Sequence, residues 1–212
     1  MKVKIVKNIL DANDQMALEN KKLFDEAGVI AINIMASPGA GKTSLILSTI
    51  DLLGLPVAVV EGDIASTFDA EKVGAKKVPV VQINTGGACH LDAAMVRKAV
   101  ERLGLEGARV LFVENVGNLV CPAEFKLGES ARVVVASVPE GDDKPYKYPG
   151  MFSAATAVVL NKIDTLPVIE FDMRRFKKGV HAVNANAPIF EVSCKTGQGL
   201  HSWIEWLRKL AG

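Results

Sequence analysis

The chain has 212 residues, of which 49% are hydrophobic, which is enough for one well-buried domain but cramped for two independent cores. Its 25 lysine and arginine residues nearly balance its 24 aspartate and glutamate residues, so the net charge of +1 gives no general attraction for nucleic acid or an anionic membrane. No apolar run approaches the ~20 residues that a membrane span requires, and residues 1–7 are too polar for a signal-peptide core. Three cysteines are an odd number, which argues against a disulfide framework. We therefore expect one cytoplasmic domain without nucleic-acid or membrane partners.

Short apolar runs rich in β-branched residues recur along the chain, and they are nearly continuous, as is typical of strands buried on both faces. They cover residues 29–35, 57–60, 78–83, 110–113, 133–138, 157–160 and 189–192. Helical periodicity follows several of them, over residues 43–53, 92–103, 167–178 and 200–210. This alternation predicts a mostly parallel sheet covered by helices.

A further helix is predicted upstream of the first strand, over residues 11–27. Leu18, Leu23 and Phe24 provide its apolar contacts, and Gly28 ends it. We expect this helix to pack on the flank of the domain.

The segment 36–43 matches the P-loop pattern between a strand and a helix, except that Ala36 replaces the first glycine. The glycines of such a loop let successive backbone N–H groups curl around phosphate oxygens, and the following helix turns its positive end towards them. Lys42 is expected to bridge the β- and γ-phosphates and the Thr43 hydroxyl to coordinate Mg²⁺. The alternative is an ordinary glycine-rich turn that caps a helix. The predicted phosphate-binding residues are Pro38, Gly39, Ala40, Gly41, Lys42, Thr43 and Ser44.

Two acidic residues come at the ends of predicted strands, where open α/β sheets place their ligand chemistry. Asp63 is expected to bind Mg²⁺ directly or through water, and Glu114 takes the place of the usual Walker-B acid. Gly117 leaves a backbone N–H to meet a γ-phosphate, which is the usual trigger of a GTPase switch. Alternatively, either carboxylate caps a neighbouring helix. The predicted catalytic residues are Lys42, Asp63, Glu114 and Gly117, with Thr43, Asp63 and Glu114 as magnesium ligands.

Cys89 and His90 are adjacent between a predicted strand and a predicted helix, and Cys121 follows Glu114 after a short step. Thiolate and imidazole are softer donors than magnesium needs, and they suit Zn²⁺ or Ni²⁺. Three ligands are too few for a closed structural site, so either a two-fold dimer shares the metal or the site keeps open positions. The alternative is that both cysteines are small buried hydrophobic residues and that His90 only begins a helix. The spacing alone leaves this choice open.

A base-recognition motif, Asn161, Lys162 and Asp164, comes directly after the strand predicted at residues 157–160. The Asp164 carboxylate can accept two hydrogen bonds from the N1–H and amino group of guanine, which adenine does not offer, so we expect GTP rather than ATP. A loop after the last strand is expected to close over the base. The predicted base-binding residues are Asn161, Lys162, Asp164, Ser193, Cys194 and Lys195.

Taken in order, residues 39–43, 61–63, 86–92, 114–122 and 161–164 resemble the HypB family, the nickel-incorporation GTPases of NiFe-hydrogenase maturation, which belong to the SIMIBI class of P-loop proteins. Residues 140–149 also resemble a segment of that family. The predicted fold class is α/β: a three-layer P-loop NTPase fold with a mostly parallel sheet of about seven strands flanked by helices. Residues 1–28 are predicted as an N-terminal flanking helical segment of the same domain, and residues 29–212 as the GTPase domain.

The resemblance implies a metallochaperone that binds GTP or GDP with Mg²⁺ and delivers nickel. It implies a homodimer favoured by GTP, with Ni²⁺ or Zn²⁺ bound through Cys89, His90 and Cys121 near the interface. It also implies the nickel-binding accessory protein HypA as a partner and a hydrogenase large-subunit precursor as the client. Some members carry an N-terminal cysteine-rich nickel motif or a histidine-rich tail, whereas residues 1–30 here contain neither Cys nor His. High-affinity N-terminal nickel storage is therefore not expected.

As a mechanism, we expect GTP and Mg²⁺ to order the segments around Asp63 and residues 114–117 and to favour a dimer. Because Cys121 lies on the same segment as Glu114, loss of the γ-phosphate would reach a metal ligand directly. No residue is an obvious general base, so catalysis is expected to rest on positioning and charge neutralisation, with slow intrinsic turnover.

Three alternatives remain at this stage. A urease-type nickel-insertion GTPase usually has Cys-Pro-His at its metal motif, whereas Ala123 follows Cys121 and Pro122 here. A regulatory GTPase without metal would keep its cysteines in the core. An ATP-dependent small-molecule kinase would prefer adenine.

Overall fold

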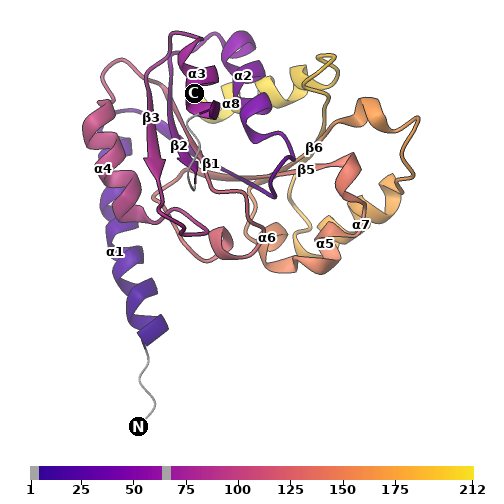
Figure 1. The fold of residues 1–212 in the computed structure, drawn as a ribbon, viewed down its shortest axis with the longest axis horizontal. Helices are drawn as coiled ribbons and strands as arrows, with labels where there is room; N and C mark the ends of the chain where they lie inside the picture. Colours follow the sequence, from indigo (N-terminus) through magenta and orange to yellow (C-terminus); the bar gives the residue numbers. More distant parts are fainter. Residues whose placement is uncertain (1–4, 64–67) are drawn as a thin grey trace.

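The computed structural model describes residues 5–63 and 68–212 and contains a seven-stranded sheet in which every strand pair is parallel (Figure 1). The strand order is β3-β2-β4-β1-β5-β6-β7. This confirms the predicted α/β fold with a sheet of parallel strands. Residues 1–4, at the polar start of the chain, lie outside the described residues. The strands are β1 (Ile30–Ala36), β2 (Val57–Asp63), β3 (Val80–Asn84), β4 (Val110–Glu114), β5 (Ala131–Ser137), β6 (Ala157–Asn161) and β7 (Ile189–Glu191).

Helices cover both faces of the sheet (Figure 1). On one face, α2, α3 and α8 pack on the strands around the buried Trp203. On the other face, α1 and α4 cover β2 and β4, while α6 and α7 cover β5 and β6. The helices are α1 (Ile5–Glu26), α2 (Lys42–Leu53), α3 (Phe68–Gly74), α4 (Ala93–Leu103), α5 (Lys144–Lys147), α6 (Pro149–Ser153), α7 (Met173–Val183) and α8 (Leu200–Ala211), with 3-10 turns at Cys121–Ala123, Val138–Glu140 and Ile163–Thr165.

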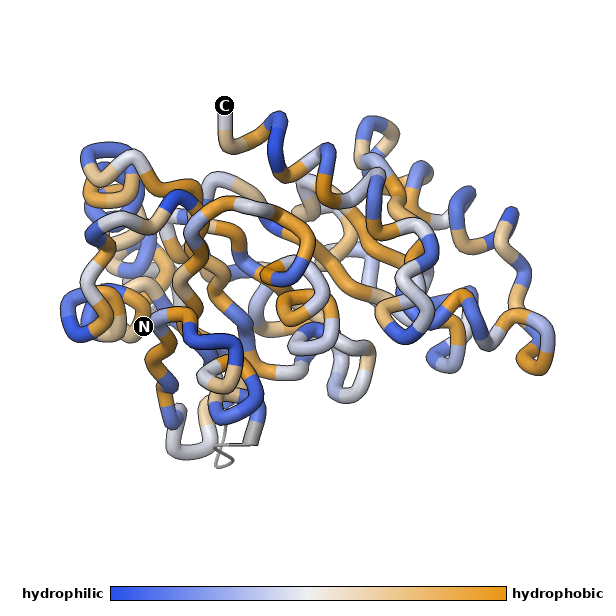
Figure 2. Tube along the Cα trace, turned by 90° about the horizontal axis from the view of Figure 1, so that it is seen from above, coloured by the Kyte–Doolittle hydropathy of each residue, from blue (hydrophilic) through white to orange (hydrophobic). Residues whose placement is uncertain are grey.

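The hydropathy pattern accounts for these layers. Apolar residues follow the central strands, and hydrophilic residues gather in the outer turns (Figure 2). The C-terminal helix alternates between the two kinds, as an amphipathic helix does when one side covers a sheet (Figure 2). None of the described helices is both long enough and apolar enough to cross a membrane.

Capping side chains determine where α4 and α7 begin. The Asp92 carboxylate accepts a hydrogen bond from the Met95 N–H and starts α4, and Asp172 does the same for the Arg175 N–H at the start of α7. The helix predicted over residues 167–178 is therefore wrong in its bounds, because the Asp172 cap delays its start and it continues to Val183.

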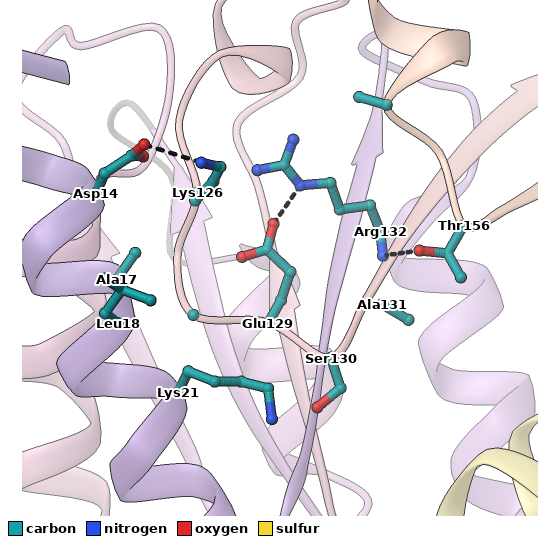
Figure 3. Close-up of a pocket in the computed structure, with 12 residues that line it drawn as sticks. Asp14, Ala17, Leu18, Lys21, Lys126, Glu129, Ser130, Ala131, Arg132 and Thr156 are labelled. Atoms are coloured by element: carbon teal, nitrogen blue, oxygen red, sulfur yellow. Dashed lines mark hydrogen bonds and ion pairs between the residues drawn. The ribbon is translucent and has the colours of Figure 1, made fainter. Parts of the chain in front are cut away.

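The N-terminal helix α1 packs beside α4 (Figure 1). The predicted apolar contacts of this helix are only partly correct. Phe24 is fully buried and Leu23 packs against the same core, whereas the Leu18 side chain is 65% exposed. Leu18 lines a pocket of about 460 Å³ between α1 and residues 126–132, away from the P-loop. Figure 3 shows this pocket, with Lys126 paired to Asp14 on one side and Arg132 to Glu129 on the other.

The helix that follows the P-loop, α2, is fixed to α8 by a buried polar contact. The Trp203 indole N–H donates to the Thr49 hydroxyl over 2.8 Å, and Thr49 in turn donates to the Leu45 carbonyl within α2. Both side chains are fully buried. A buried donor needs a partner, so this contact orients α8 on α2.

We expect Thr49→Val to lower the free energy of unfolding by about 1–3 kcal/mol, because the isosteric valine leaves the Trp203 N–H buried without an acceptor. Urea unfolding followed by tryptophan fluorescence measures this. The same substitution at the exposed Thr196 should change stability by less than about 0.5 kcal/mol. Equal effects at the two sites would contradict a specific Trp203 contact.

Candidate functional site

Residues 37–41 form a tight loop between β1 and α2. Gly39 and Gly41 have φ values of 76° and 104°, which favour glycine. A Cβ atom at Gly41 would lie 2.3 Å from the Asn161 Nδ2 atom, so the loop has no room for a side chain there. Ala36 is the last residue of β1 and is fully buried, which explains why alanine is tolerated at the first glycine position of the motif. The loop therefore points its N–H groups and the start of α2 at one place.

A pocket of about 250 Å³ opens beside this loop, at the carboxyl ends of β2 and β4. The structure brings the predicted Lys42, Asp63, Glu114 and Gly117 together around it. Gly117 packs on Pro38: a Cβ atom at Gly117 would lie 3.0 Å from the Pro38 backbone. Ser44, in the first turn of α2, is exposed. The residues that line the pocket are Pro38, Gly39, Lys42, Glu61, Gly62, Asp63, Asp69, Glu114, Asn115, Val116 and Gly117.

Glu61 is a pocket residue that the sequence analysis missed. It is directly opposite Glu114 in the parallel β2–β4 ladder, so the two carboxylates lie side by side. The available signal was its position two residues before Asp63, which puts both acids on the same face of the strand. The Glu114 Oε1 atom accepts a hydrogen bond of 2.8 Å from the Thr43 hydroxyl, whereas the Oε2 atoms of Glu61 and Glu114 are buried without a hydrogen-bond partner.

Burial controls the protonation of these two acids. It raises the pKa of Glu114 to about 7, against the lowering effects of Lys42 and of the Thr43 hydroxyl. Burial and the neighbouring Glu114 charge raise the pKa of Glu61 to about 8. Two carboxylates with unpartnered oxygens, next to a threonine hydroxyl, are hard oxygen donors that fit a divalent cation such as Mg²⁺.

The predicted base-binding residues lie at the carboxyl ends of β6 and β7. The Asn161 amide donates to the Ala40 carbonyl over 3.1 Å and accepts hydrogen bonds from the backbone N–H groups of Lys162 and Cys194. The Asp164 carboxylate accepts a hydrogen bond of 2.7 Å from the Ser193 hydroxyl. Asn161 therefore ties the P-loop to both loops that would enclose a base.

The basic residues of this end differ in their contacts. The Lys162 ammonium donates to the Gly39 carbonyl over 2.6 Å, which places its stem between the P-loop and the Asp164 loop. Lys195 is exposed. Burial raises the pKa of the Cys194 thiol to about 11, so this cysteine stays protonated at neutral pH.

Cys89, His90 and Cys121 come together from two different loops. The sulfur atoms of Cys89 and Cys121 are 2.9 Å apart, and the Cys89 sulfur lies 3.7 Å from the His90 Nδ1 atom. One donor atom from each of the three residues fits within 4.8 Å of the others, and all three side chains are half-buried. The His90 ring stacks on Phe125 with 3.9 Å between ring centroids.

The electrostatics of this cluster favour metal ligation. Burial lowers the pKa of His90, which favours the neutral imidazole that binds metals. The hydrogen bond with Cys89 is the main cause of a raised pKa of Cys121, and burial and the repulsion between the Cys89 and Cys121 charges act in the same direction. A soft divalent cation would remove that repulsion.

Two asparagines of α1 hold the backbones that carry these ligands. The Asn13 side-chain Oδ1 atom accepts from the Ala93 N–H, and its Nδ2 group donates to the Lys126 backbone carbonyl. The Asn20 amide donates to the carbonyls of Ala93 and Leu127. The sequence analysis did not find this role, because polar residues in an amphipathic helix are normally assigned to solvent.

The tract 140–149 adjoins the P-loop. The Glu140 carboxylate accepts hydrogen bonds from the hydroxyls of Ser37 and Ser137. Asp142 forms an ion pair of 3.0 Å with Arg175 at the start of α7. This segment therefore connects the loop that precedes Gly39 to the helix layer under β6.

Comparison with known proteins agrees with this geometry. Residues 30–191 match the family model described as CobW/HypB/UreG, nucleotide-binding domain. The hydrogenase maturation factor HypB of Azotobacter chroococcum is 47% identical over 213 residues, which is 99% of this chain and 70% of that protein. The crystal structure of HypB from Helicobacter pylori in complex with nickel superimposes with a TM-score of 0.92 at 39% identity, covering 94% of this chain and 95% of the other. HypB from Archaeoglobus fulgidus gives a TM-score of 0.89 at 37% identity, covering 95% and 100%.

The raised pKa of Glu114 predicts a pH dependence of stability. Between the ordinary glutamate pKa of about 4.3 and about 7 the folded protein binds more protons at this residue than the unfolded chain does, so the stability present at low pH is lost as the pH rises. In EDTA, wild type should therefore lose stability relative to Glu114→Gln from pH 5 to 8, by an amount on the order of 2 to 3 kcal/mol. Urea unfolding at several pH values measures this. Glu19→Gln, at an exposed position of α1, serves as the control, and parallel curves for wild type and Glu114→Gln would refute the shift.

Proposed function

The chain belongs to the HypB family of hydrogenase maturation factors, and from this premise we propose that it is a GTP-hydrolysing metallochaperone that delivers nickel during NiFe-hydrogenase maturation. The observation that carries the proposal is the convergence of Cys89, His90 and Cys121 within 4.8 Å, on loops that adjoin a P-loop pocket. A nucleotide site alone would fit many P-loop proteins. The soft-donor cluster beside it is what indicates a metal cargo.

In this proposal, the phosphates of GTP bind between the P-loop and the pocket acids. The N–H groups of residues 39–43 and the Lys42 ammonium hold the phosphate oxygens, and the Gly117 N–H meets the γ-phosphate. Thr43, Asp63 and Glu114 hold Mg²⁺, which neutralises charge on the phosphates when bound. Positioning and charge neutralisation then provide the catalysis, and intrinsic hydrolysis is slow.

Guanine is selected by Asp164. Its carboxylate is held by the Ser193 hydroxyl and can accept from the N1–H and amino group of the base. Lys162 lies along the base plane while its ammonium holds the Gly39 carbonyl, so base and phosphate binding support each other. The backbone of Ser193, Cys194 and Lys195 closes the loop over the base.

Nickel, or zinc in its place, is the cargo of the cluster. Two thiolates and one imidazole leave at least one coordination position open, which allows a partner to deliver or remove the metal. We expect a homodimer favoured by GTP, in which the cluster lies near the interface, with HypA as the nickel-binding partner and the hydrogenase large-subunit precursor as the client. The Helicobacter pylori relative is a hydrogenase/urease maturation factor, but Ala123 after Cys121 and Pro122 favours the hydrogenase role here.

Hydrolysis is coupled to the metal through the segment that begins at Glu114. Gly117 meets the γ-phosphate and Cys121 ligates the metal on the same short stretch of chain, so loss of the phosphate changes the position of a ligand. This coupling lets GTP hydrolysis time the release of nickel.

The metal site is tested by equilibrium dialysis with Ni²⁺ and Zn²⁺. We expect Cys89→Ala and Cys121→Ala each to weaken nickel binding at least about tenfold, because each removes one of three ligands. Cys194→Ala is the matched control, since that thiol is buried in the base-binding loop and should leave metal affinity unchanged. Unchanged nickel affinity in both ligand variants would instead support a regulatory GTPase without metal.

Base selection is tested by Asp164→Asn. The amide can no longer accept two guanine hydrogen bonds, so GTP affinity should fall at least about a hundredfold, while xanthine nucleotides should gain affinity because the amide donates to their 2-oxo group. Competition with a fluorescent nucleotide measures both, with Asp11→Asn at an exposed position of α1 as the control. A wild type that prefers ATP would contradict the assignment and favour a kinase.

A further inference from the structure

The loop that carries Cys89 and His90, residues 85–92, is attached directly to the strand that carries the pocket acids. At its start, the Thr85 N–H donates to the Asp63 carbonyl over 2.9 Å. Near its end, Leu91 is fully buried against Gly62. A Cβ atom at Gly62 would lie 2.8 Å from the Cγ, Cδ1 and Cδ2 atoms of Leu91. Gly62 therefore provides the space that the Leu91 side chain occupies.

The alternation of side chains along β2 explains this arrangement. Glu61 and Asp63 point to the P-loop face of the sheet, so Gly62 between them faces the opposite side, where α4 packs. Leu91 belongs to the core cluster of that side, with Val60, Val113 and Val96. A movement of the backbone between the two acids is therefore transmitted to Leu91, next to His90.

A second contact joins the same residue to the strand of Glu114. The side-chain Oδ1 atom of Asn115 accepts hydrogen bonds of 3.0 Å from the backbone N–H groups of Leu91 and Val116. The Asn115 Nδ2 group donates to the side-chain Oδ1 atom of Asn33, on β1, over 3.2 Å. Asn33 and Asn115 are both fully buried. Because a buried polar group without a hydrogen-bond partner costs free energy, these hydrogen bonds hold Leu91 in place relative to β1 and β4.

We propose that Leu91, seated on Gly62 and held by Asn115, is the positioning residue through which the nucleotide pocket sets the geometry of the Cys89–His90 loop. Cys121 is attached to the pocket along the chain, whereas Cys89 and His90 are attached through this junction. Phosphate and cation binding between β2 and β4 would thus move the ligands of both loops together. This inference rests on the proposed metal and nucleotide roles and specifies how one regulates the other.

The test measures the Ni²⁺ affinity of the full chain by competition with a chromogenic chelator, in the presence of Mg²⁺ with GDP or with a non-hydrolysable GTP analogue. The ratio of the two affinities is the coupling factor, which we expect to be at least about fivefold in wild type. Leu91→Ala removes the contact with Gly62, and Asn115→Ala removes the acceptor for the Leu91 N–H. Each should bring the factor to within about twofold of unity, and Leu91→Ala, which does not line the pocket, should still bind nickel and GTP.

Gly62→Ala changes the other partner of the Leu91–Gly62 contact, because the added methyl group must displace the Leu91 side chain. This variant should also lose the coupling, and the double variant Gly62→Ala/Leu91→Ala should recover part of it, since the smaller residue at position 91 removes the clash. Val96→Ala, a truncation of another side chain in the same core cluster, is the matched control and should keep the wild-type factor. Urea unfolding identifies the variants that fold, and Leu91→Ala decides the test if Gly62→Ala does not fold.

Recovery in the double variant, together with loss in the single variants, supports the junction. The inference is overturned if wild type shows no coupling, if Leu91→Ala and Asn115→Ala keep it, or if the double variant is worse than either single one. These outcomes leave the proposed function intact as long as wild type binds nickel and Cys89→Ala does not. Failure of nickel binding in wild type would instead overturn the proposed function itself.

Discussion

The parallel pairing of β4 with β1 on one side and β2 on the other is the constraint on which the whole site depends. Because parallel strands end at the same edge of a sheet, this pairing brings the P-loop after β1 next to Glu114 and places Glu61 opposite Glu114. Burial at that edge raises the pKa of both carboxylates, so their ionised form is disfavoured when no cation is nearby. The register of the strands therefore creates the demand for a cation.

Side chains alternate between the two faces of the sheet along these strands, and this alternation separates the carboxylates of the pocket from the Cys89, His90 and Cys121 cluster. The side chains that face α2 point towards the pocket beside the P-loop, while the alternate side chains face α4 and the loops that carry Cys89, His90 and Cys121. Gly62 and Asn115 belong to the second set, one position from the acids Glu61 and Glu114. A hard-donor oxygen site and a soft-donor sulfur site thus lie on opposite faces of the same strand ends, close enough to be coupled but with separate ligands.

The sequence allowed good prediction of features that local pattern determines. The P-loop, the Asn161–Asp164 motif and the pair Cys89–His90 are contiguous, so their chemistry is visible without the fold. Features that depend on tertiary packing were not predictable in this way. Glu61 became a pocket residue only through its register with Glu114, and Leu18 is exposed because the sheet lies on the other side of α1. The start of α7 was misplaced because apolar residues continue upstream of its Asp172 cap.

The buried asparagines of α1 complete the physical argument for a transfer site. A buried amide is costly unless its groups are hydrogen-bonded. Both polar groups of Asn13 and the Nδ2 group of Asn20 bond to the backbone at Ala93 and at Lys126–Leu127, while the Asn20 Oδ1 atom is buried without a hydrogen-bond partner. They hold the inner side of both ligand loops, while the donor side chains remain half-buried and accessible. A fixed backbone that presents accessible soft ligands has low reorganisation on binding, and it allows a metal to enter and leave without unfolding the loops. The N-terminal helix is thus part of the architecture of the proposed metal site as well as a flank of the domain.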